Sequence, residues 1–356
     1  MPILFHLLLA LYHFSSGTPP DYSSVDSVAK TVRYRGNLDS LTLQLTAPYT
    51  QPLFKARAIF IWITDNIAYD YKHYNHLNFK GEVEQSFSCS DDEDCAARRV
   101  AWETKYLDRV LRRKKAVCEG YALLFKKMCT LAGLTAEVIP GYSRSKDYQV
   151  GTPGTLDHAW DALWLDSSYY LLDPTWAAGG CMTDEEGKLL FFQKRFNNYY
   201  WLTPPAEFSR NHYPRDSIWT LIPHYTKEKF AKNPYYLPSE LANIHVRTPA
   251  TGVITTKKGD TIRFSVQYRE GFQDLQINSN LFRNPDLWTS EKLSRRKTIR
   301  RLDTAAQRRQ QYVPYRRDGH TYSFEYVVTD SALYYLDILF DRRQVLRFIV
   351  QITPDP

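Results

Sequence analysis

Long apolar runs are scarce in this sequence of 356 residues. After residue 14, no segment approaches the roughly 18 uninterrupted apolar residues that mark a membrane-spanning helix. No cysteine follows the apolar run at the start, so a bacterial lipid anchor is not indicated, and no internal repeat is apparent. We therefore expect no integral membrane segment beyond the first residues.

Metal-binding motifs are also missing. The sequence contains neither a C-x-x-C pair nor an H-E-x-x-H motif, which are spacings typical of zinc sites. We therefore expect neither a metal nor a cofactor, and a zinc protein is a weak hypothesis. The five cysteines are Cys89, Cys95, Cys118, Cys129 and Cys181. The first two flank an acidic turn and could close a short loop in an oxidising compartment, and the odd count leaves at least one thiol free.

The composition is that of an ordinary globular protein with a basic balance. Hydrophobic residues make up 43% and charged residues 24%, and the length suggests about two domains. The net charge of +7 favours acidic partners, and an anionic envelope or surface polymer would fit. Because no nucleic-acid fold signature accompanies the charge, we do not expect nucleic-acid binding.

The first 17 residues resemble a secretory signal peptide. The apolar run from Pro2 to Phe14 is too short to span a bilayer, and small residues at positions 15–17 offer a cleavage region. The run has no preceding Lys or Arg, so a translated leader or a buried strand is the alternative. The prediction is therefore a secreted or periplasmic protein, in which residues 18–50 form a linker and an extended arm.

Residues 51–245 have the pattern of an α+β core, with helices packed on an antiparallel sheet. An amphipathic helix opens at Pro52, and a second apolar helix begins at about Cys118. Two strands follow at 159–165 and 169–172, separated by a short turn that predicts antiparallel pairing. The order of helices first and an antiparallel sheet second is typical of α+β folds.

The pattern changes near residue 246. Several later segments alternate or are rich in β-branched residues, so we expect residues 246–356 to form a β-rich, Ig-like sandwich domain. The middle of this region, from Lys292 to Arg317, is rich in arginine and could be a long solvated loop.

Cys118 is the strongest candidate for a nucleophile. It lies at the start of a predicted helix, where unsatisfied amides and the helix dipole favour a thiolate, and four basic residues precede it. A thiolate is a nucleophile suited to acyl transfer. Gly120, two residues later, would let a substrate backbone approach closely.

His158 and Asp173 are placed to assist such a thiolate. His158 opens a predicted strand, and imidazole both accepts and donates a proton near neutral pH. Asp173 ends the neighbouring strand, so the hairpin brings both residues to the same side, where the carboxylate would orient the imidazole. Trp160 and Trp176 would shape the walls of a substrate site, although core packing explains them equally well.

Each of these residues alone is weak support. A lone cysteine on an apolar helix is usually buried packing, and Cys129, on the same predicted helix, is interpreted in this way. An aspartate before proline is usually a turn former. The order Cys, His, Asp in helix, strand and strand contexts makes the catalytic interpretation stronger than its parts.

Three segments that contain these residues resemble the catalytic boxes of the transglutaminase-like superfamily, most closely its kyphoscoliosis peptidase branch. They read VCEGYALLFKKMCTLAGL, DHAWDALWLD and YYLLDPTWAAG. IFIWITDNIAYD upstream and FSRNHYPRDSIWTLI downstream are also similar to that branch, so the resemblance covers about residues 52–225. It implies a papain-like or transglutaminase-like core with Cys118 as nucleophile, His158 as base and Asp173 as orienting acid. One departure is Asp161, where the family usually has Asn after HAW.

The resulting prediction is a secreted, thiol-dependent acyl-transfer enzyme that acts on protein or peptide amides. Water as the second substrate would give a peptidase or amidase, which we favour, and an amine would give a crosslinking transglutaminase. The alternative is a non-catalytic scaffold that binds protein partners through the core and the β-rich domain, because fold alone does not settle function.

Overall fold

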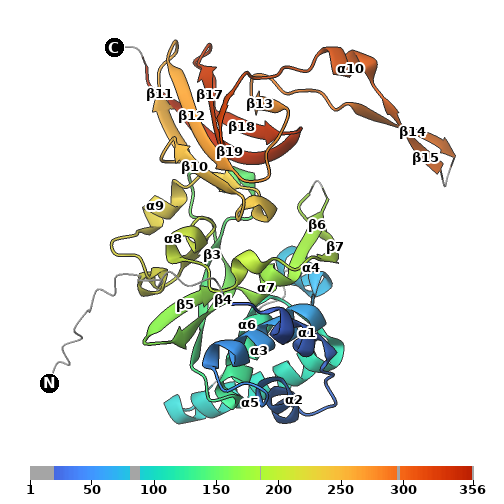
Figure 1. Ribbon diagram of the computed structural model, residues 1–356, viewed down its shortest axis with the longest axis vertical. Helices are drawn as coiled ribbons and strands as arrows, with labels where there is room; N and C mark the ends of the chain where they lie inside the picture. The colour runs from blue at the N-terminus through green and yellow to red at the C-terminus, as the bar shows by residue number, and fades with distance from the viewer. Residues whose placement is uncertain (1–19, 81–88, 185, 295–296, 355–356) are drawn as a thin grey trace.

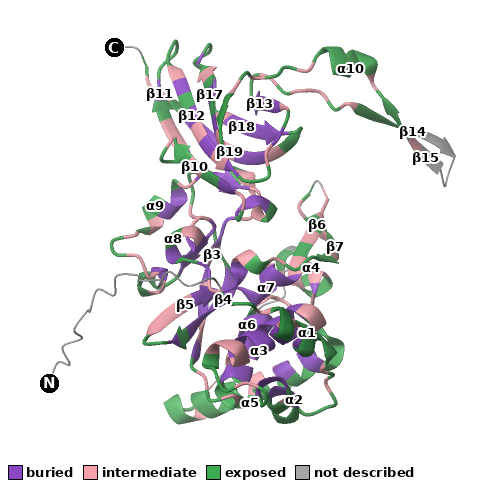
Figure 2. Cartoon of the chain, in the orientation of Figure 1, coloured by how far each residue is buried: buried purple, intermediate pink, exposed green. Residues whose placement is uncertain are grey.

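The computed structural model describes residues 20–80, 89–184, 186–294 and 297–354, so the predicted signal peptide lies outside it. A helical layer and a small antiparallel sheet form one end of the molecule, and a β-sandwich forms the other (Figure 1). Buried residues concentrate where helices meet the sheet and between the two layers of the sandwich (Figure 2). Within the described ranges, none of the helices combines the length and the apolar character needed to cross a membrane. The α+β class predicted from the sequence is confirmed.

Two helices form the centre of the helical layer. Helix α3 (Pro52–Asn66) begins with proline at its first position, where the missing N–H costs nothing, and it buries nearly every residue from Ala56 to Thr64. Helix α6 (Cys118–Leu131) packs against α3 and against the sheet. Both helices were expected from their apolar spacing, and α6 begins at Cys118 as predicted.

The predicted linker and extended arm at residues 18–50 is wrong. The segment instead contains α1 (Ser23–Thr31) and α2 (Leu38–Thr46), which pack on α3. Each helix is only nine residues long and buries few apolar side chains, so its periodicity is hard to distinguish from scattered polar sequence.

Arg57 ties α1 to the core. Its buried guanidinium donates to both carboxylate oxygens of Asp26 in α1, at 2.8 and 2.7 Å, and to Asn198 Oδ1 at 2.7 Å. The same group lies 4.6 Å from the centre of the Tyr22 ring. The buried charge of Arg57 is therefore paired with a carboxylate and hydrogen-bonded, as a buried charge requires.

Helix α5 (Asp92–Arg113) packs against α6, and helix α4 (Tyr71–Lys80) packs against strand β7 (Leu189–Lys194). Asp91 caps α5 by accepting from the Asp94 N–H at 2.8 Å. Cys89 and Cys95 are joined by a disulfide at the start of this helix. The sequence had left open whether these two cysteines pair.

The core sheet has the strand order β5-β4-β3-β8, with antiparallel pairing throughout. Its strands are β3 (Ala136–Ser143), β4 (Leu156–Leu165), β5 (Ser168–Leu172) and β8 (His212–Pro214). Helix α6 covers β3 and β4. This arrangement brings the start of β4 and the end of β5 close to the N-terminus of α6.

Gly141 allows an indole to pack across the sheet. It lies opposite His158 in the pairing of β3 with β4. A Cβ at this position would lie 2.1 Å from the Trp160 ring and 2.5 Å from the Tyr213 carbonyl oxygen. No side chain therefore fits between β3 and Trp160.

The remaining short elements of the core connect these layers. They are β1 (Ala68–Tyr69), β2 (Lys115–Ala116), α7 (Pro174–Ala178), β6 (Gly179–Thr183), β7 (Leu189–Lys194), α8 (Pro205–Phe208), α9 (Lys227–Ala231) and the 3₁₀ turns η1 (Asp147–Gln149), η2 (Asn198–Tyr200), η3 (Ser217–Thr220) and η4 (Pro238–Glu240).

The C-terminal region is a sandwich of two sheets. One contains β10 (Ile244–Thr248), β12 (Thr261–Tyr268), β17 (Thr321–Val327) and β16 (Arg316–Asp318). The other contains β9 (Tyr235–Tyr236), β11 (Val253–Thr256), β19 (Arg343–Ile352), β18 (Tyr335–Phe340) and β13 (Leu275–Ser279). Stacked Phe264 and Phe324 rings, 4.9 Å apart, meet Phe348 of the second sheet in the interior. The β-rich character predicted from the alternating sequence is confirmed.

The arginine-rich segment expected as a solvated loop is ordered instead. Strands β14 (Trp288–Ser294) and β15 (Lys297–Leu302) pair as a hairpin, and α10 (Thr304–Arg308) follows. Figure 1 shows the hairpin projecting from the sandwich as an arm. Its polar sequence hid the strand pairing, since little of it is buried against a core.

Candidate active site

Cys118 occupies the first position of α6, and its side chain is partly exposed. The N–H groups of this first turn have no acceptor within the helix, so they and the helix dipole face the thiol region. Gly120 does not fulfil its predicted role. It is buried, and a Cβ there would lie 2.7 Å from Ala116 Cβ and 2.9 Å from the Tyr106 hydroxyl. Internal packing, and not access for a substrate, therefore explains the glycine.

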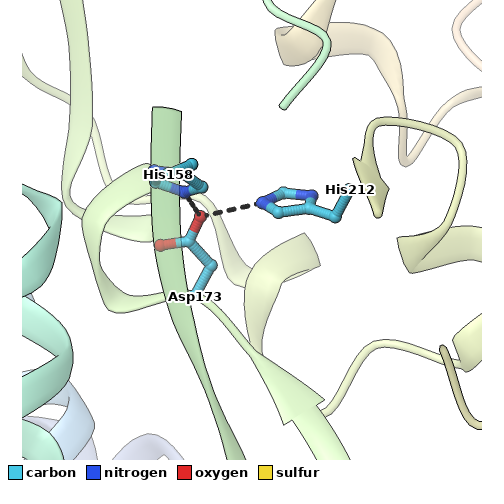
Figure 3. Close-up of side chains that lie close together, drawn as sticks. All are labelled: His158, Asp173 and His212. Carbon is cyan, nitrogen blue, oxygen red and sulfur yellow. Dashed lines mark hydrogen bonds and ion pairs between the residues drawn. The ribbon is translucent and has the colours of Figure 1, made fainter. Parts of the chain in front are cut away.

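His158 and Asp173 meet as the hairpin predicted. His158 Nε2 lies 2.7 Å from Asp173 Oδ2, and both residues are buried (Figure 3). The other carboxylate oxygen, Oδ1, accepts from the N–H groups of Thr175 at 2.8 Å and Trp176 at 3.0 Å, because Asp173 is also the N-cap of α7. All the hydrogen bonds of this carboxylate are thus made inside the protein, which fixes its orientation.

A second imidazole, absent from the sequence predictions, shares the same carboxylate oxygen. His212 Nε2, on β8, lies 3.1 Å from Asp173 Oδ2 (Figure 3). Its Nδ1 lies 2.7 Å from the side-chain amide of Asn211, which in turn contacts the Tyr200 hydroxyl at 3.1 Å. The only sequence signal was that His212 lies in the downstream segment FSRNHYPRDSIWTLI.

The charges of the cluster follow from its burial and pairing. Burial lowers the pKa of His158, but the charge and hydrogen bond of Asp173, with a hydrogen bond to the Cys118 side chain, raise it overall to about 10. Burial opposes ionisation of Asp173, yet His158 and His212 hold its pKa below the ordinary range. For His212, burial dominates and lowers the pKa to about 4. At neutral pH, His158 is therefore a cation between Cys118 and Asp173, whereas His212 is neutral.

His158 Nε2, His212 Nε2 and Asp173 Oδ2 lie within 4.8 Å of one another, a spacing that a metal ion could use. Each of these atoms already takes part in a hydrogen bond of the cluster. A divalent ion would have to displace the protons that orient both imidazoles. The arrangement therefore fits a hydrogen-bond network that holds protons better than it fits a metal site.

Aromatic rings enclose the two histidines. The His158 ring lies 5.1 Å from Trp176 and 6.1 Å from Trp160, and the His212 ring stacks on Phe208 at 4.2 Å. Trp160 is only 1% exposed, so its predicted role in contacting substrate is wrong, and it packs behind the imidazoles. Trp176 is partly exposed and lies against the His158 ring, and its role in a substrate wall stays a prediction.

Tyr69 lies beside β2, the short strand that leads into Cys118, and it was also absent from the sequence predictions. Strand β1 runs parallel to β2, with Tyr69 opposite Ala116, two residues before Cys118. Backbone bonds from Ala68 N to Lys114 O at 2.9 Å and from Asp70 N to Ala116 O at 2.8 Å fix this register. Burial, followed by the nearby Cys118, raises the pKa of Tyr69 well above its ordinary value. Its hydroxyl is therefore a protonated donor close to the thiol.

Asp161 is a carboxyl group that the fold leaves without a partner. It is fully buried on β4, and neither side-chain oxygen has a hydrogen-bond partner among the described residues. Burial and the negative charge of Asp173 raise the pKa of Asp161 well above its ordinary value. This is the position where the sequence departs from the family's usual Asn.

Replacing Asp161 with Asn should stabilise the protein increasingly as pH rises. The raised pKa means that the folded state holds a proton that the unfolded state releases from about pH 4 upward, so the wild type loses stability with rising pH and the variant does not. We expect a gain of about 1–3 kcal/mol at pH 8, read from thermal melts at pH 4 and pH 8. A difference between the two proteins that is the same at both pH values would contradict this account.

The comparisons with known proteins agree with this geometry. Residues 82–174 match the family model of the transglutaminase-like superfamily. Kyphoscoliosis peptidase from Homo sapiens is 32% identical over 67% of this chain and 32% of its own length, and Hillarin from Drosophila melanogaster is 27% identical over 57% of this chain and 23% of its own.

The chain spans about a third of the length of the kyphoscoliosis peptidases that it matches. A solved TGase structure covers 49% of this chain and 37% of its own at 15% identity, with a TM-score of 0.27, and adds nothing to the assignment. The family match and the curated relatives are sufficient. The chain carries a domain of the transglutaminase-like superfamily and is similar to the kyphoscoliosis peptidases over 67% of its length.

Proposed function

We propose that this chain is a thiol-dependent acyl-transfer enzyme acting on peptide or protein amides. The observation that carries the proposal is the buried hydrogen bond between His158 and Asp173, with the His158 imidazole next to the Cys118 thiol at the N-terminus of a helix. A cationic imidazole beside a thiol stabilises the thiolate, and the buried carboxylate holds that imidazole in place.

The proposed reaction has two steps. The Cys118 thiolate attacks the amide carbonyl, His158 donates its proton to the departing amine, and a thioester forms on Cys118. Water or a second amine then attacks the thioester and gives its proton to His158, and Cys118 leaves as the thiolate, which restores the starting ion pair. The Cys118 N–H and the Tyr69 hydroxyl are the proposed donors to the oxyanion of both tetrahedral intermediates.

We favour hydrolysis over crosslinking, and the names of the peptidase relatives support that preference. Secretion stays part of the proposal, and the Cys89–Cys95 disulfide is compatible with an oxidising compartment. A scaffold that binds partners without catalysis is the alternative. The buried His158–Asp173 pair next to Cys118 argues against it, since a scaffold has no need of an oriented His beside a thiol.

The alkylation rate of Cys118 tests the proposal without a known substrate. We expect iodoacetamide to label Cys118 rapidly at pH 6, and His158→Ala to slow that labelling by about 10²-fold. Peptide mapping by mass spectrometry identifies the labelled thiol. Burial raises the pKa of Cys129 well above its usual value and that of Cys181 to about 11, so both competing thiols should react slowly.

His320→Ala, at an exposed position in the sandwich, is the matched control and should label like the wild type. Labelling of Cys118 that is slow in the wild type, or equal in both histidine variants, would reject the catalytic proposal and leave the scaffold. A positive result would be followed by fluorogenic peptide amides, with amine incorporation measured in parallel.

A further inference from the structure

A polar cavity of about 570 Å³ lies in the C-terminal region, far in sequence from Cys118. Its floor is the outer face of β13, β18 and β19, and its roof is the base of the arm formed by β14, β15 and α10. The volume falls within the range of about 300–1,000 Å³ that is usual for small-ligand sites.

The floor of the cavity consists of buried polar side chains. Gln276, Asn278 and Asp337 are 0%, 6% and 1% exposed, although alternation along β13 and β18 directs them away from the sandwich interior. The outer face of a sandwich sheet is normally solvated, and burying polar groups is costly unless they are satisfied. Gln276 Oε1 is itself buried and has no hydrogen-bond partner among the described residues, while the residue as a whole contributes to the lining of the cavity.

The other polar groups are held in fixed orientations. Gln276 Nε2 donates to Gln310 Oε1 at 2.8 Å, which directs its amide oxygen. Asn278 Oδ1 accepts from the N–H and the side-chain amide of Asn284, each at 2.9 Å. Gln344 Nε2 donates to Asp337 Oδ1 at 2.9 Å. The lining is therefore preorganised, which lowers the cost of ordering it around a ligand.

An exposed indole stands at the rim. Trp288 is 50% exposed, and the Arg300 guanidinium lies 5.6 Å from the centre of its ring. The lining contains equal numbers of formal charges, Arg283 and Arg342 with Asp286 and Asp337, and ion pairs of Arg342 with Asp274 and of Asp337 with Arg347 neutralise one of each sign. A strongly charged ligand is therefore not favoured over a neutral one.

We propose that this cavity binds a neutral oligosaccharide. Sugar hydroxyls both donate and accept, which matches fixed amides and a carboxylate, and the apolar face of a pyranose ring stacks on an exposed indole. The site is separate from the thiol and does not depend on the proposed reaction.

Isothermal titration calorimetry with chitohexaose, cellohexaose and mannohexaose tests the proposal on the full chain. At least one should bind, and Trp288→Ala should weaken it at least tenfold. Trp164→Ala removes an indole of similar exposure, 43%, from β4 of the core and should leave binding unchanged. Gln276→Leu, with folding checked by circular dichroism, should also weaken binding, because it removes the amide that holds Gln310 in the cavity lining.

Heparin hexasaccharide serves as the acidic comparison. No binding of any neutral hexasaccharide at 5 mM would overturn the proposal, and so would binding that survives both cavity variants. Binding of heparin alone, lost at 0.5 M NaCl or in Arg300→Ser, would assign the interaction to the charge of the arm and would also overturn it.

Discussion

Asp173→Asn should lower kcat for a cleaved peptide amide by about 10³–10⁴-fold while the protein stays folded. The N–H groups of Thr175 and Trp176 both donate to Oδ1. The amide oxygen of the new side chain must therefore take that position, because the alternative would place the amide NH₂ donors against these two N–H donors. The amide NH₂ then replaces Oδ2. It would present donors to Nε2 of both His158 and His212, which now face an acceptor.

The consequence is a reversed proton on the base. With Nε2 forced to accept, neutral His158 carries its proton on Nδ1 toward Cys118 and cannot take one from the thiol. The cation, which needs an acceptor at Nε2, is also disfavoured, so the thiolate loses its partner. The helix cap survives, since Asn caps helices about as well as Asp.

The measurement is kcat with a fluorogenic amide, alongside the pH 6 alkylation rate of Cys118. Asp216→Asn is the matched control, because Asp216 also caps a helical turn, accepting from Ile218 N at 3.1 Å, and lies outside the cluster. A kcat within tenfold of the wild type, with circular dichroism unchanged, would show that Asp173 only caps α7.

His212→Phe should lower kcat by about 10–100-fold with little change in KM. Phenylalanine keeps the stack on Phe208 but removes the second hydrogen bond to Asp173 Oδ2, so that oxygen keeps His158 as its only partner among the described residues. His212 does not reach Cys118 in the hydrogen-bond series, so it is a positioning residue for His158 and not a proton carrier.

His212→Gln distinguishes positioning from packing. Its amide can donate to Asp173 Oδ2, so it should recover part of the lost kcat although its shape fits the aromatic stack less well. His320→Phe serves as the matched control on the surface. Equal losses in both His212 variants, together with equal drops in melting temperature, would indicate that the imidazole only fills space.

The elements that could be predicted from the sequence are those specified by neighbouring residues along the chain. The start of α6 at Cys118 and the hairpin that joins His158 to Asp173 depend on periodicity and on short separations along the chain. His212 reaches Asp173 across 39 residues from a strand of three residues, β8, and no local pattern specifies that contact. Tyr69 likewise reaches the cysteine through a two-residue parallel pairing.

The errors have the same origin. Gly120 and Trp160 were given roles in substrate contact because they lie near the catalytic residues in sequence. Packing excludes both roles. Tyr106 and Ala116 fill the space beside Gly120, and the absence of a side chain at Gly141 leaves room for Trp160 to point inward. Which way a residue faces depends on neighbours from distant segments, which a single sequence does not reveal.

The ion pair between Arg57 and Asp26 makes the first helix a point of vulnerability for the whole core. Removal of α1 by a protease or by a splicing change would take away the carboxylate partner of Arg57, and breaking a buried ion pair costs about 3–5 kcal/mol. Globular proteins have a total stability of about 5–15 kcal/mol, so that loss alone could unfold the core. A cut near the N-terminus would then inactivate a thiol that it never touches, and the autonomous folding unit is longer than the segment that the family model matches.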